Sequence, residues 1–317
     1  MDTILVTGAT GQIGTELTAA LRARHGAARV IASARQPPAA DTSLGDGPFE
    51  LVDVTRPEQV REAIARHRVT IVYHLAAVLS ATAERHPAQA WSVNLDGLRY
   101  VLEAARNGGV RQLFWPSSIA AFGPDTPLDG TPQDTVMRPT TVYGIAKVAG
   151  ELLCDYHVHR YGLDVRGIRY PGVISSETAP GGGTTDYAVA IFHGALDAGR
   201  YTCFVREDTV LPMVYMPDCI RAALDLMAAP RAALTHHNGF NLAAMSFSVG
   251  ALADEIATQV PGFVCEYAPD ERQAIADSWP RTIDDSAARR EWGWAPEFGL
   301  AEMTRDMIAR LRARRGS

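Results

Sequence analysis

A tyrosine and a lysine stand four residues apart in the segment YGIAKVAGEL, residues 143–152. Lys147 is the only lysine among the 30 lysines and arginines of the chain. On a helix, residues four apart share one face, so the ammonium group of Lys147 is expected beside the phenol of Tyr143. A nearby ammonium favours the phenolate and lowers the tyrosine pKa. Such a pair can take the proton of a hydroxyl group while a hydride leaves the carbon that carries this hydroxyl.

Lysine has a reason to occur at this position in a chain that otherwise uses arginine. It is a compact point charge that can also reach ribose hydroxyls, whereas arginine is a bulky planar fork. A third partner is expected at the end of the strand RQLFWPSS, where the hydroxyl of Ser118 would meet the substrate oxygen and Tyr143. Paired serines also form turns and helix caps. We predict Ser118, Tyr143 and Lys147 as the catalytic residues.

The segment VTGATGQIGTEL joins a predicted strand to a predicted helix and carries glycines three residues apart. Gly8 permits the tight turn, Gly11 lets backbone N–H groups approach a pyrophosphate, and Gly14 allows the helix to pack closely on the strand. The N-terminus of the helix directs its partial positive charge at the phosphates. Because the glycines occur in the strand–turn–helix context that this mechanism requires, they predict a dinucleotide site, which also includes Gln12 and Ile13.

Two later segments fit the same ligand. Asp53 follows the strand FELV, where its carboxylate can accept a hydrogen bond from the adenine amino group while Val54 contacts the ring. A helix-start carboxylate is the alternative for Asp53. The segment HLAAVLS, residues 74–80, ends another strand and lets a cofactor pass close to the backbone. The site residues predicted from this segment are Leu75, Ala76 and Ala77.

The tip of the second predicted strand is unusual for an NAD site. NAD-selective folds usually place an acidic residue there to bind the ribose 2′-hydroxyl. This chain reads VIASARQPP, so Ser33, Ala34 and Arg35 occupy the tip and the next carboxylate is Asp41. Arg35 can pair with the 2′-phosphate of NADP, or can stack on the adenine and leave NAD acceptable. We predict NAD as the cofactor, with NADP possible, and place Ser33 and Arg35 in its site.

Alternating strands and helices must position these residues. Short apolar runs predict the strands, and amphipathic segments predict the helices between them. The strands are predicted at 3–7, 29–33, 49–52, 70–75, 111–115 and 164–169, and the helices at 12–25, 57–67, 87–107 and 142–161. Repeated strand–helix units imply an α/β fold of Rossmann type, a doubly wound parallel sheet with helices on both faces. Ligands bind such sheets at the carboxyl ends of the strands.

After residue 170 the alternation ends, and glycine-rich loops, short strands and isolated helices follow. These helices are predicted at 187–198, 217–228, 249–259, 285–292 and 299–314. The pattern predicts a smaller C-terminal substrate lobe over the strand ends, and a surface loop at 34–48. We assign residues 1–172 to the dinucleotide-binding domain, with 212–242 returning to it. The substrate-binding lobe then comprises 173–211 and 243–317.

The composition argues against several classes of partner. The net charge of −6 disfavours nucleic acid and anionic membranes. No apolar run reaches the roughly 18 residues of a transmembrane helix, and the N-terminus lacks the features of a secretory signal. The four cysteines are scattered without CxxC spacing. We therefore expect reduced thiols in a cytoplasmic protein with no metal site.

The glycine motif TGxxGxxG at 7–14, the strand-end serines and YxxxK at 143–147 together resemble the extended short-chain dehydrogenases/reductases, whose members include epimerase-like enzymes for nucleotide sugars. Further segments are similar to those of the short-chain, epimerase-like L-threonine 3-dehydrogenases. They are LSATAE (79–84), WPSSIAAFGP (115–124), TVYGIAK (141–147), RYPGVIS (169–175), PGGGTTDYAV (180–189), NLAAMSF (241–247) and IADSWP (275–280). The resemblance covers essentially the whole chain, and PGGGTTDYAV followed by IADSWP is much more specific than the glycine loop.

The resemblance implies an enzyme of amino-acid catabolism that oxidises the 3-hydroxyl of L-threonine to 2-amino-3-ketobutyrate, with hydride transfer to NAD. It implies a substrate site of Ser80, Ser118, Tyr143, Gly182, Thr184, Thr185 and Trp279. It adds Asn94, Tyr143, Lys147, Tyr170, Pro171 and Val173 to the cofactor site. The one clear departure is Ala34, at a position where the family commonly has an acidic residue.

The residues of the substrate loop agree in part with this implication. The glycines at 181–183 can offer backbone N–H groups to a carboxylate, and Thr184 and Thr185 supply short hydroxyls for a small polar ligand. A surface turn remains the alternative for PGGG, and a core position remains the alternative for Trp279.

Two other functions fit parts of the pattern. A nucleotide-sugar epimerase or reductase would need cations for the substrate diphosphate, and the candidates are Arg206, Arg272, Arg281 and Arg289. The small residues of 180–185 favour a small ligand instead. A cofactor-sensing regulator would have no need of the Tyr143–Lys147 pair. Helices 87–107 and 142–161 pair subunits in many relatives, so we expect a homodimer, with a monomer as the alternative.

Overall fold

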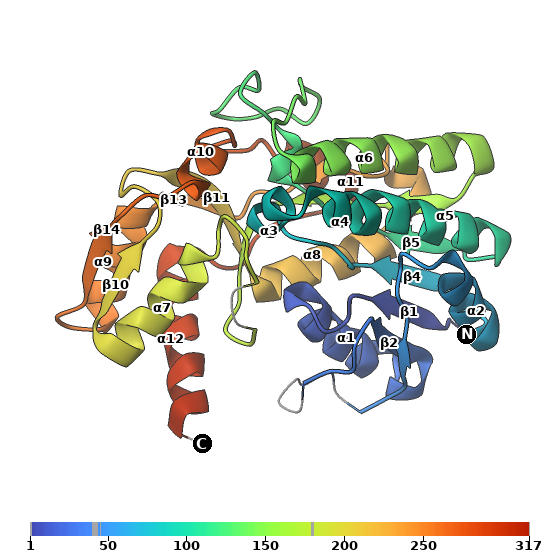
Figure 1. Ribbon diagram of the computed structural model, residues 1–317, viewed down its shortest axis with the longest axis horizontal. Helices are drawn as coiled ribbons and strands as arrows, with labels where there is room; N and C mark the ends of the chain where they lie inside the picture. Colours follow the sequence, from blue (N-terminus) through green and yellow to red (C-terminus); the bar gives the residue numbers. More distant parts are fainter. Residues whose placement is uncertain (1, 40–43, 45, 179–180, 317) are drawn as a thin grey trace.

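The computed structural model of the chain describes residues 2–39, 44, 46–178 and 181–316. Its centre is a sheet of six parallel strands in the order β3-β2-β1-β4-β5-β7 (Figure 1). These strands are β1 (Ile4–Thr7), β2 (Val30–Ala34), β3 (Phe49–Leu51), β4 (Ile71–His74), β5 (Gln112–Phe114) and β7 (Asp164–Arg166). The strand order reverses between β1 and β4, so the sheet is doubly wound, and the predicted Rossmann-type α/β fold is confirmed.

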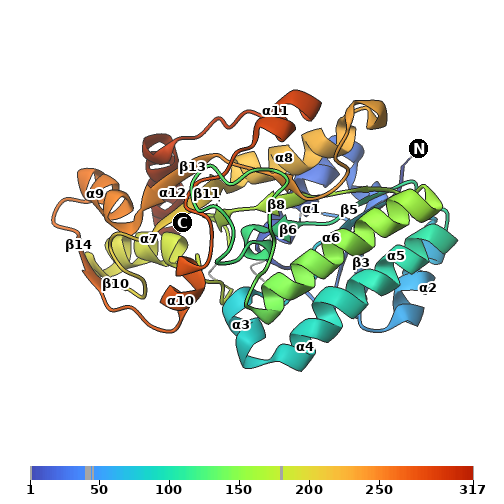
Figure 2. The ribbon, with the colours of Figure 1, turned by 90° about the horizontal axis from the view of Figure 1, so that it is seen from above.

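Helices cover both faces of this sheet because successive side chains of a strand point to opposite faces. The helices are α1 (Gln12–His25), α2 (Pro57–His67), α5 (Gly97–Asn107), α6 (Val142–Tyr161) and α8 (Met216–Ala228). Ile4 and Val6 of β1 share an apolar core with α1 and α8. Leu5 between them shares a second core with α2, α5 and α6. Figure 2 shows α5 and α6 side by side over this second face. Helices α1, α2 and α6 have the predicted bounds.

The strand predicted at 164–169 is wrong as a single element. The chain leaves the central sheet at Gly167, and β8 (Ile168–Tyr170) joins a separate sheet between β6 (Ser117–Ser118) and β12 (Phe240–Asn241). A Cβ atom at Gly167 would lie 2.5 Å from the backbone oxygen of Trp115, so this crossing requires glycine. The turn brings Tyr170 into register beside Ser118.

The helix predicted at 87–107 is also interrupted. It consists of α4 (Pro87–Trp91), a π-helical turn (Ser92–Asp96) and α5, and the unpredicted helix α3 (Ser80–Arg85) precedes it. The π-helical turn contains Asn94, which is buried. Its side-chain amide accepts a hydrogen bond from the backbone N–H of Val78 (2.7 Å) and donates one to the Val78 carbonyl (2.9 Å). This pair of bonds holds the loop that follows β4.

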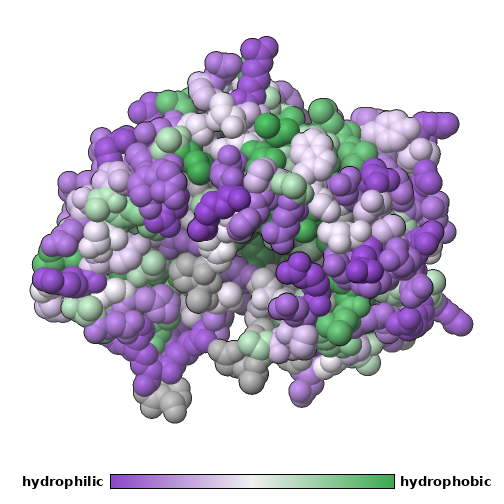
Figure 3. Space-filling view, viewed as in Figure 1, coloured by the Kyte–Doolittle hydropathy of each residue, from purple (hydrophilic) through white to green (hydrophobic). Residues whose placement is uncertain are grey.

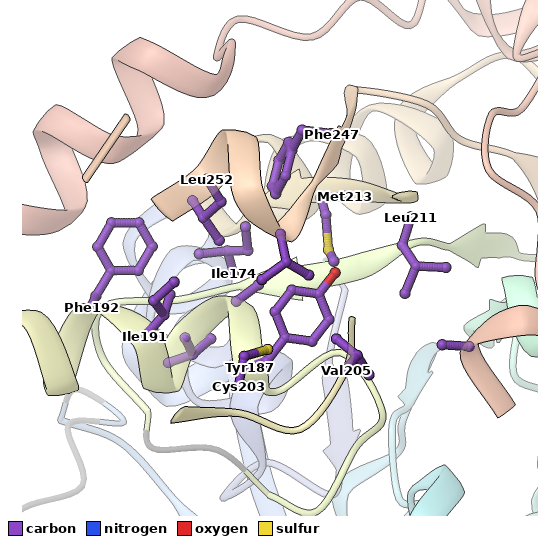
Figure 4. Packing of buried hydrophobic residues seen from close by; sticks show 14 of the residues in the cluster. Ile174, Tyr187, Ile191, Phe192, Cys203, Val205, Leu211, Met213, Phe247 and Leu252 are labelled. Carbon is purple, nitrogen blue, oxygen red and sulfur yellow. The ribbon is translucent and has the colours of Figure 1, made fainter. Parts of the chain in front are cut away.

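The C-terminal part of the chain forms a second lobe beside the central sheet (Figure 1). Its strands are β9 (Gly172–Ile174), β10 (Arg200–Cys203), β11 (Val210–Tyr215), β13 (Met245–Ser248) and β14 (Val264–Tyr267). Its helices are α7 (Tyr187–Ala198), α9 (Val249–Gln259), α10 (Arg272–Asp277) and α12 (Leu300–Gly316). Helix α11 (Ser286–Trp292) instead packs with the apolar core of α1 and α8. Elsewhere in the chain, short 3-10 turns lie at Ala27–Arg29, Ile119–Ala121 and Arg231–Ala233. Figure 4 shows Tyr187 and Phe192 of α7 packed with Met213, Phe247 and Leu252.

The contacts of residues 212–242 bear on how the chain is divided between the dinucleotide-binding domain and the substrate-binding lobe. Helix α8 packs against α1, and β12 pairs with β8, whereas β11 pairs with β9 and β13. We therefore keep as a proposal that 212–242 returns to the dinucleotide-binding domain. In the described part of the chain, every helix is too short or too polar to cross a lipid bilayer.

Candidate active site

A groove follows the carboxyl ends of the central strands, and Figure 3 shows the surface hollowed between the two lobes. It has three adjoining sections, which share Leu75 and Ala77 as lining residues. We call them the tyrosine, glycine and aspartate sections after Tyr143, Gly14 and Asp53. Their volumes are about 140, 470 and 260 Å³ respectively.

Most of the residues predicted from the sequence line this groove. The lining residues among them are Gly8, Gly11, Gln12, Ile13, Gly14, Arg35, Asp53, Val54, Leu75, Ala76, Ala77, Ser80, Ser118, Tyr143, Lys147, Tyr170, Pro171, Val173, Thr184, Thr185 and Trp279. Three others do not line it: Ser33 and Asn94 are buried, and Gly182 is half-buried between the lining residues Gly181 and Gly183. The fold therefore brings together side chains from the first third of the chain and from its C-terminal lobe.

In the glycine section, backbone segments approach each other so closely that there is no space for a side chain at the glycines. Gly8 has a φ of +71°, and a Cβ atom there would lie 2.6 Å from the backbone nitrogen of Ala76. A Cβ atom at Gly14 would lie 2.2 Å from the carbonyl oxygen of Gly8. The N-terminus of α1 therefore reaches the groove without obstruction. This cradle fits a dinucleotide pyrophosphate bound to backbone N–H groups at a helix N-terminus.

The aspartate section lies where β2 and β3 end. Asp53 lines it, and its Oδ1 accepts hydrogen bonds from the Thr55 N–H (3.0 Å) and hydroxyl (2.7 Å). Partial burial opposes ionisation of Asp53, but these hydrogen bonds and nearby arginines bring its pKa below the usual value. Ser33 is buried, and its hydroxyl donates to the Val6 carbonyl (3.1 Å), so Ala34 rather than Ser33 faces the groove. Asp41 lies outside the described residues.

The tyrosine section brings Ser118, Tyr143 and Lys147 together. Thr141 caps α6 by accepting a hydrogen bond from the Gly144 N–H, which places Tyr143 in the first turn and Lys147 one turn later. The Lys147 Nζ donates to the Pro116 carbonyl (2.6 Å). It lies 4.5 Å from the ring centroid of Trp115 and 5.4 Å from that of Tyr143. The expected common face of tyrosine and lysine is present.

The electrostatics of this pair differ from the expectation of a lowered tyrosine pKa. Burial raises the pKa of Tyr143 to about 12, and the hydrogen bond with Ser118 offsets only part of that effect. Burial lowers the pKa of Lys147 to about 8, against the opposing charge of Glu151. Removal from water disfavours both the phenolate of Tyr143 and the ammonium of Lys147. In the protein by itself, this effect is larger than the attraction between the two charges. The predicted lowering of the Tyr143 pKa by Lys147 is therefore not seen in the protein by itself.

A buried carboxylate distinguishes the two adjacent serines. Ser117 donates to Glu151 at 2.5 Å, and Arg169 forms an ion pair with Glu151 at 2.8 Å. Ser117 is thus held within the protein, whereas Ser118 lines the groove and also caps the turn Ile119–Ala121 by accepting from the Ala120 N–H. The catalytic and the capping interpretations of Ser118 are therefore compatible. The sequence analysis missed Glu151, although it stands four residues after Lys147.

The residues predicted to bind the substrate lie where α3 meets the loop before α7. The hydroxyls of Ser80 and Thr184 lie 3.0 Å apart, and the Thr184 N–H donates to Ser80 at 3.1 Å. Both residues are buried, as is Trp279, which belongs to the core of the C-terminal lobe and also lines the groove. Thr185 can approach β9 because Gly172 has no side chain; a Cβ atom there would lie 2.9 Å from Thr185.

The expectation that the glycine loop offers free N–H groups to a carboxylate is wrong in this structure. The N–H groups of Gly182 and Gly183 donate to Asp186 at 2.7 and 2.8 Å. Burial raises the pKa of Asp186, although these hydrogen bonds oppose the shift. Asp186 also lines the groove and precedes α7, a position where Asp is a common cap, and that signal could have identified it. Pro180 lies outside the described residues.

The four arginines considered for a diphosphate all have carboxylate partners. The ion pairs are Arg206 with Asp277 (2.9 Å), Arg272 with Asp270 (2.5 Å), Arg281 with Asp129 (2.6 Å) and Arg289 with Asp285 (2.7 Å). None of them is among the described residues that line the tyrosine section. A second phosphate-bearing ligand would have to compete with these ion pairs.

The comparisons with known proteins agree with this geometry. Residues 4–243 match the model of the NAD dependent epimerase/dehydratase family. An uncharacterised epimerase/dehydratase of Staphylococcus haemolyticus is 47% identical over 309 residues, which cover 97% of each chain. The GalE-like L-threonine dehydrogenase of Cupriavidus necator, in its holo form, is 52% identical with a TM-score of 0.94 and covers 98% of this chain and 99% of its own.

A monomeric L-threonine 3-dehydrogenase from a metagenome is also similar, at 48% identity and a TM-score of 0.95, over 98% of this chain and 99% of its own. The resemblance to L-threonine 3-dehydrogenases is thereby confirmed. The family and these relatives indicate an NAD-dependent enzyme of the oxidoreductase or epimerase type. The glycine cradle, the Tyr143–Lys147 pair on α6 and the match over most of its length establish that the chain belongs to the NAD dependent epimerase/dehydratase family of extended short-chain dehydrogenases/reductases.

Proposed function

We propose that this protein is an L-threonine 3-dehydrogenase, which oxidises the 3-hydroxyl of L-threonine to give 2-amino-3-ketobutyrate with NAD as the acceptor. The observation that carries the proposal is the small size and polarity of the tyrosine section. It encloses about 140 Å³ and brings the hydroxyls of Ser80, Thr184 and Thr185 to the same cavity as Tyr143. Such a cavity, with short hydroxyls beside the proposed base, suits a small polar amino acid.

The residues of this cavity have distinct tasks in the proposed reaction. Tyr143 takes the proton of the substrate 3-hydroxyl, and Ser118 forms a hydrogen bond with the same oxygen as it becomes a carbonyl. Lys147, held by the Pro116 carbonyl, keeps its positive charge near the phenolate. Ser80 and Thr184 orient the amino-acid end of the substrate. A bound nicotinamide dinucleotide supplies the hydride acceptor.

The direct test is the absorbance of the reduced nicotinamide when the protein is mixed with NAD and L-threonine. We expect turnover with L-threonine, and slower turnover with L-serine, because the substrate methyl group would contact the apolar part of the cavity near Trp279. UDP-glucose serves as the comparison ligand for a nucleotide-sugar epimerase or reductase. Binding of UDP-glucose, with no turnover of L-threonine by either NAD or NADP, would replace the proposal with that alternative.

We further propose that the protein forms a homodimer through α6 and α4. Ile145, Leu152 and Tyr156 are large exposed side chains on α6, and Trp91 of α4 is exposed as well. Figure 3 shows apolar atoms gathered over the region of α6. Contiguous exposed apolar side chains of this kind mark protein interfaces. The monomeric relative makes the assembly state a matter for direct measurement.

Leu152→Glu tests the proposed dimer, because it places a charge on the most exposed of these side chains, at 62%. We expect the wild type to sediment as a dimer and the variant to shift to monomer by at least about tenfold in the dimer dissociation constant, since an unpaired buried charge costs several kcal/mol. The matched control is Val264→Glu on β14, which is 50% exposed and lies in the other lobe. A wild type that sediments as a monomer would contradict the proposal.

A further inference from the structure

The adenosine end of the groove carries an unusual charge for an NAD site. Asp53 is the one carboxylate among the described residues that line the aspartate section. At the tip of β2, where a carboxylate would receive the ribose 2′-hydroxyl, the lining residue is Ala34. The methyl group of Ala34 can neither accept that hydrogen bond nor repel a phosphate. The section therefore lacks the feature that normally excludes a 2′-phosphorylated dinucleotide.

The next residue supplies a cation at the same place. Arg35 lines the aspartate section and is exposed, and among the described residues its guanidinium has no ion-pair or hydrogen-bond partner. The other arginines considered above as ligands are all engaged with carboxylates. A guanidinium that borders a groove and has no carboxylate to neutralise it is suited to bind a phosphate.

A second cation reinforces the first. Arg56 follows Asp53 by three residues, and its backbone N–H donates to the Asp53 carbonyl (3.0 Å). Arg56 is not among the described residues that line the section, so it contributes as a nearby positive charge and not as a lining group. Together with Arg35 it helps to hold the pKa of Asp53 below its usual value. The carboxylate is itself partly satisfied by Thr55. The section is therefore lined by one cation, Arg35, and one hydrogen-bonded carboxylate, Asp53, with Arg56 close by.

The backbone that carries Arg35 is held in place. The Ala34 carbonyl accepts a hydrogen bond from the Val52 N–H (3.0 Å), and Ala34 pairs with Leu51 of β3. The buried hydroxyl of Ser33 is bonded to β1. The tip of β2 therefore has little freedom, and Arg35 starts from a defined position beside Asp53.

From these observations we propose that the aspartate section binds a 2′-phosphorylated adenosine, so that the protein accepts NADP as well as NAD, with Arg35 as the main ligand of the 2′-phosphate and Arg56 as a secondary one. The inference rests on the proposed use of a nicotinamide dinucleotide at this groove. It does not depend on which hydroxyl compound is oxidised.

The test compares two adenosine ligands by calorimetry, without substrate or turnover. Adenosine 2′,5′-bisphosphate and 5′-AMP differ only in the 2′-phosphate. We expect the wild type to bind the bisphosphate at least about tenfold more tightly at low salt, because a charge-assisted phosphate contact has this magnitude. The preference should shrink as the ionic strength rises, since Arg35 is exposed.

Three variants make the test specific. Arg35→Gln should bring the two affinities to within about threefold of each other, and Arg56→Gln should have a smaller effect of the same sign. Ala34→Asp should reverse the preference. Arg290→Gln is the charge-matched control, because Arg290 is an exposed arginine on α11 and does not line the section. Retention of the preference in Arg35→Gln, or a wild type that binds 5′-AMP as tightly as the bisphosphate, would overturn the proposal.

This measurement separates the inference from the proposed reaction. A protein that shows the Arg35-dependent preference and yet fails to oxidise L-threonine would leave the inference standing and remove only the proposed substrate. A protein that oxidises L-threonine with NAD and ignores the 2′-phosphate would do the opposite.

Discussion

Replacement of Tyr143 by phenylalanine is expected to lower kcat for L-threonine oxidation by about a thousandfold while the protein stays folded. General acid–base groups contribute about 10²- to 10⁴-fold to rates, and Tyr143 is the proposed base. The substitution removes one oxygen and keeps the ring, which is buried at the start of α6. The hydroxyl is neutral near pH 7, because burial raises the pKa of Tyr143 to about 12. Its loss costs the fold about one hydrogen bond, with Ser118, or roughly 1 kcal/mol.

The measurement is steady-state kinetics together with thermal unfolding and cofactor binding. Tyr156→Phe is the matched control, because Tyr156 lies on the same helix, is exposed, and has its hydroxyl 3.4 Å from that of Tyr161. We expect that control to keep wild-type kcat. Wild-type kcat in Tyr143→Phe itself would remove the proposed mechanism, whatever the substrate.

Lys147→Arg is expected to lower kcat/KM by at least a hundredfold, although arginine is the cation that the chain uses elsewhere. The ammonium fits between the Pro116 carbonyl and the rings of Trp115 and Tyr143. The space is completed by Gly150, where a Cβ atom would lie 2.4 Å from the Trp115 ring. A guanidinium is larger and has five N–H donors to satisfy in this buried position. The guanidinium of an arginine at position 147 would therefore place its positive charge farther from the phenolate of Tyr143.

Two companion variants sharpen this prediction. Arg160→Lys on the exposed end of α6 makes the reverse exchange away from the groove and should leave the kinetics unchanged. Lys147→Met should lose activity to the same degree as the arginine variant and unfold at an equal or higher temperature at pH 7, because a buried ammonium group is costly. If Lys147→Arg keeps the wild-type kcat/KM, the occurrence of lysine at position 147 must have another explanation.

The pH dependence of stability gives an independent check on the buried lysine. Burial lowers the pKa of Lys147 to about 8 from its ordinary 10.5, so the unfolded chain binds this proton more tightly than the folded one. Its contribution to stability therefore rises with pH between about 8 and 10.5 and is lowest below pH 8. The stability advantage of Lys147→Met should shrink across that interval, as followed by thermal unfolding at pH 7 and pH 10.

Local patterns were enough to predict much of the fold. The apolar period of 12–25, 57–67 and 142–161 predicted three helices with the bounds that the structure has. Local signals mark several of their ends: Pro57 begins the second, Thr141 caps the third, and Gly26 and Gly162 follow the first and the third. The spacing of Tyr143 and Lys147 predicted their common face for the same reason. The failures occurred where a distant segment decides the geometry. Gly167 divides the expected strand 164–169 because the carbonyl of Trp115 occupies the space of a side chain.

The sequence by itself determined which chemical groups are available: one lysine four residues after a tyrosine, glycines at the first helix, and an alanine followed by an arginine where a carboxylate is usual. Spacing along a helix or at a strand end is a local property, so these groups could be identified without coordinates. Only the tertiary structure decided their surroundings. It buries Tyr143 and Lys147 and so shifts their pKa values in directions unfavourable to charge, it uses the N–H groups of Gly182 and Gly183 to bind Asp186, and among the described residues it leaves the guanidinium of Arg35 without an ion-pair partner. Burial and hydrogen-bond partners come from residues distant in the chain, and these set whether a group is charged and free to bind.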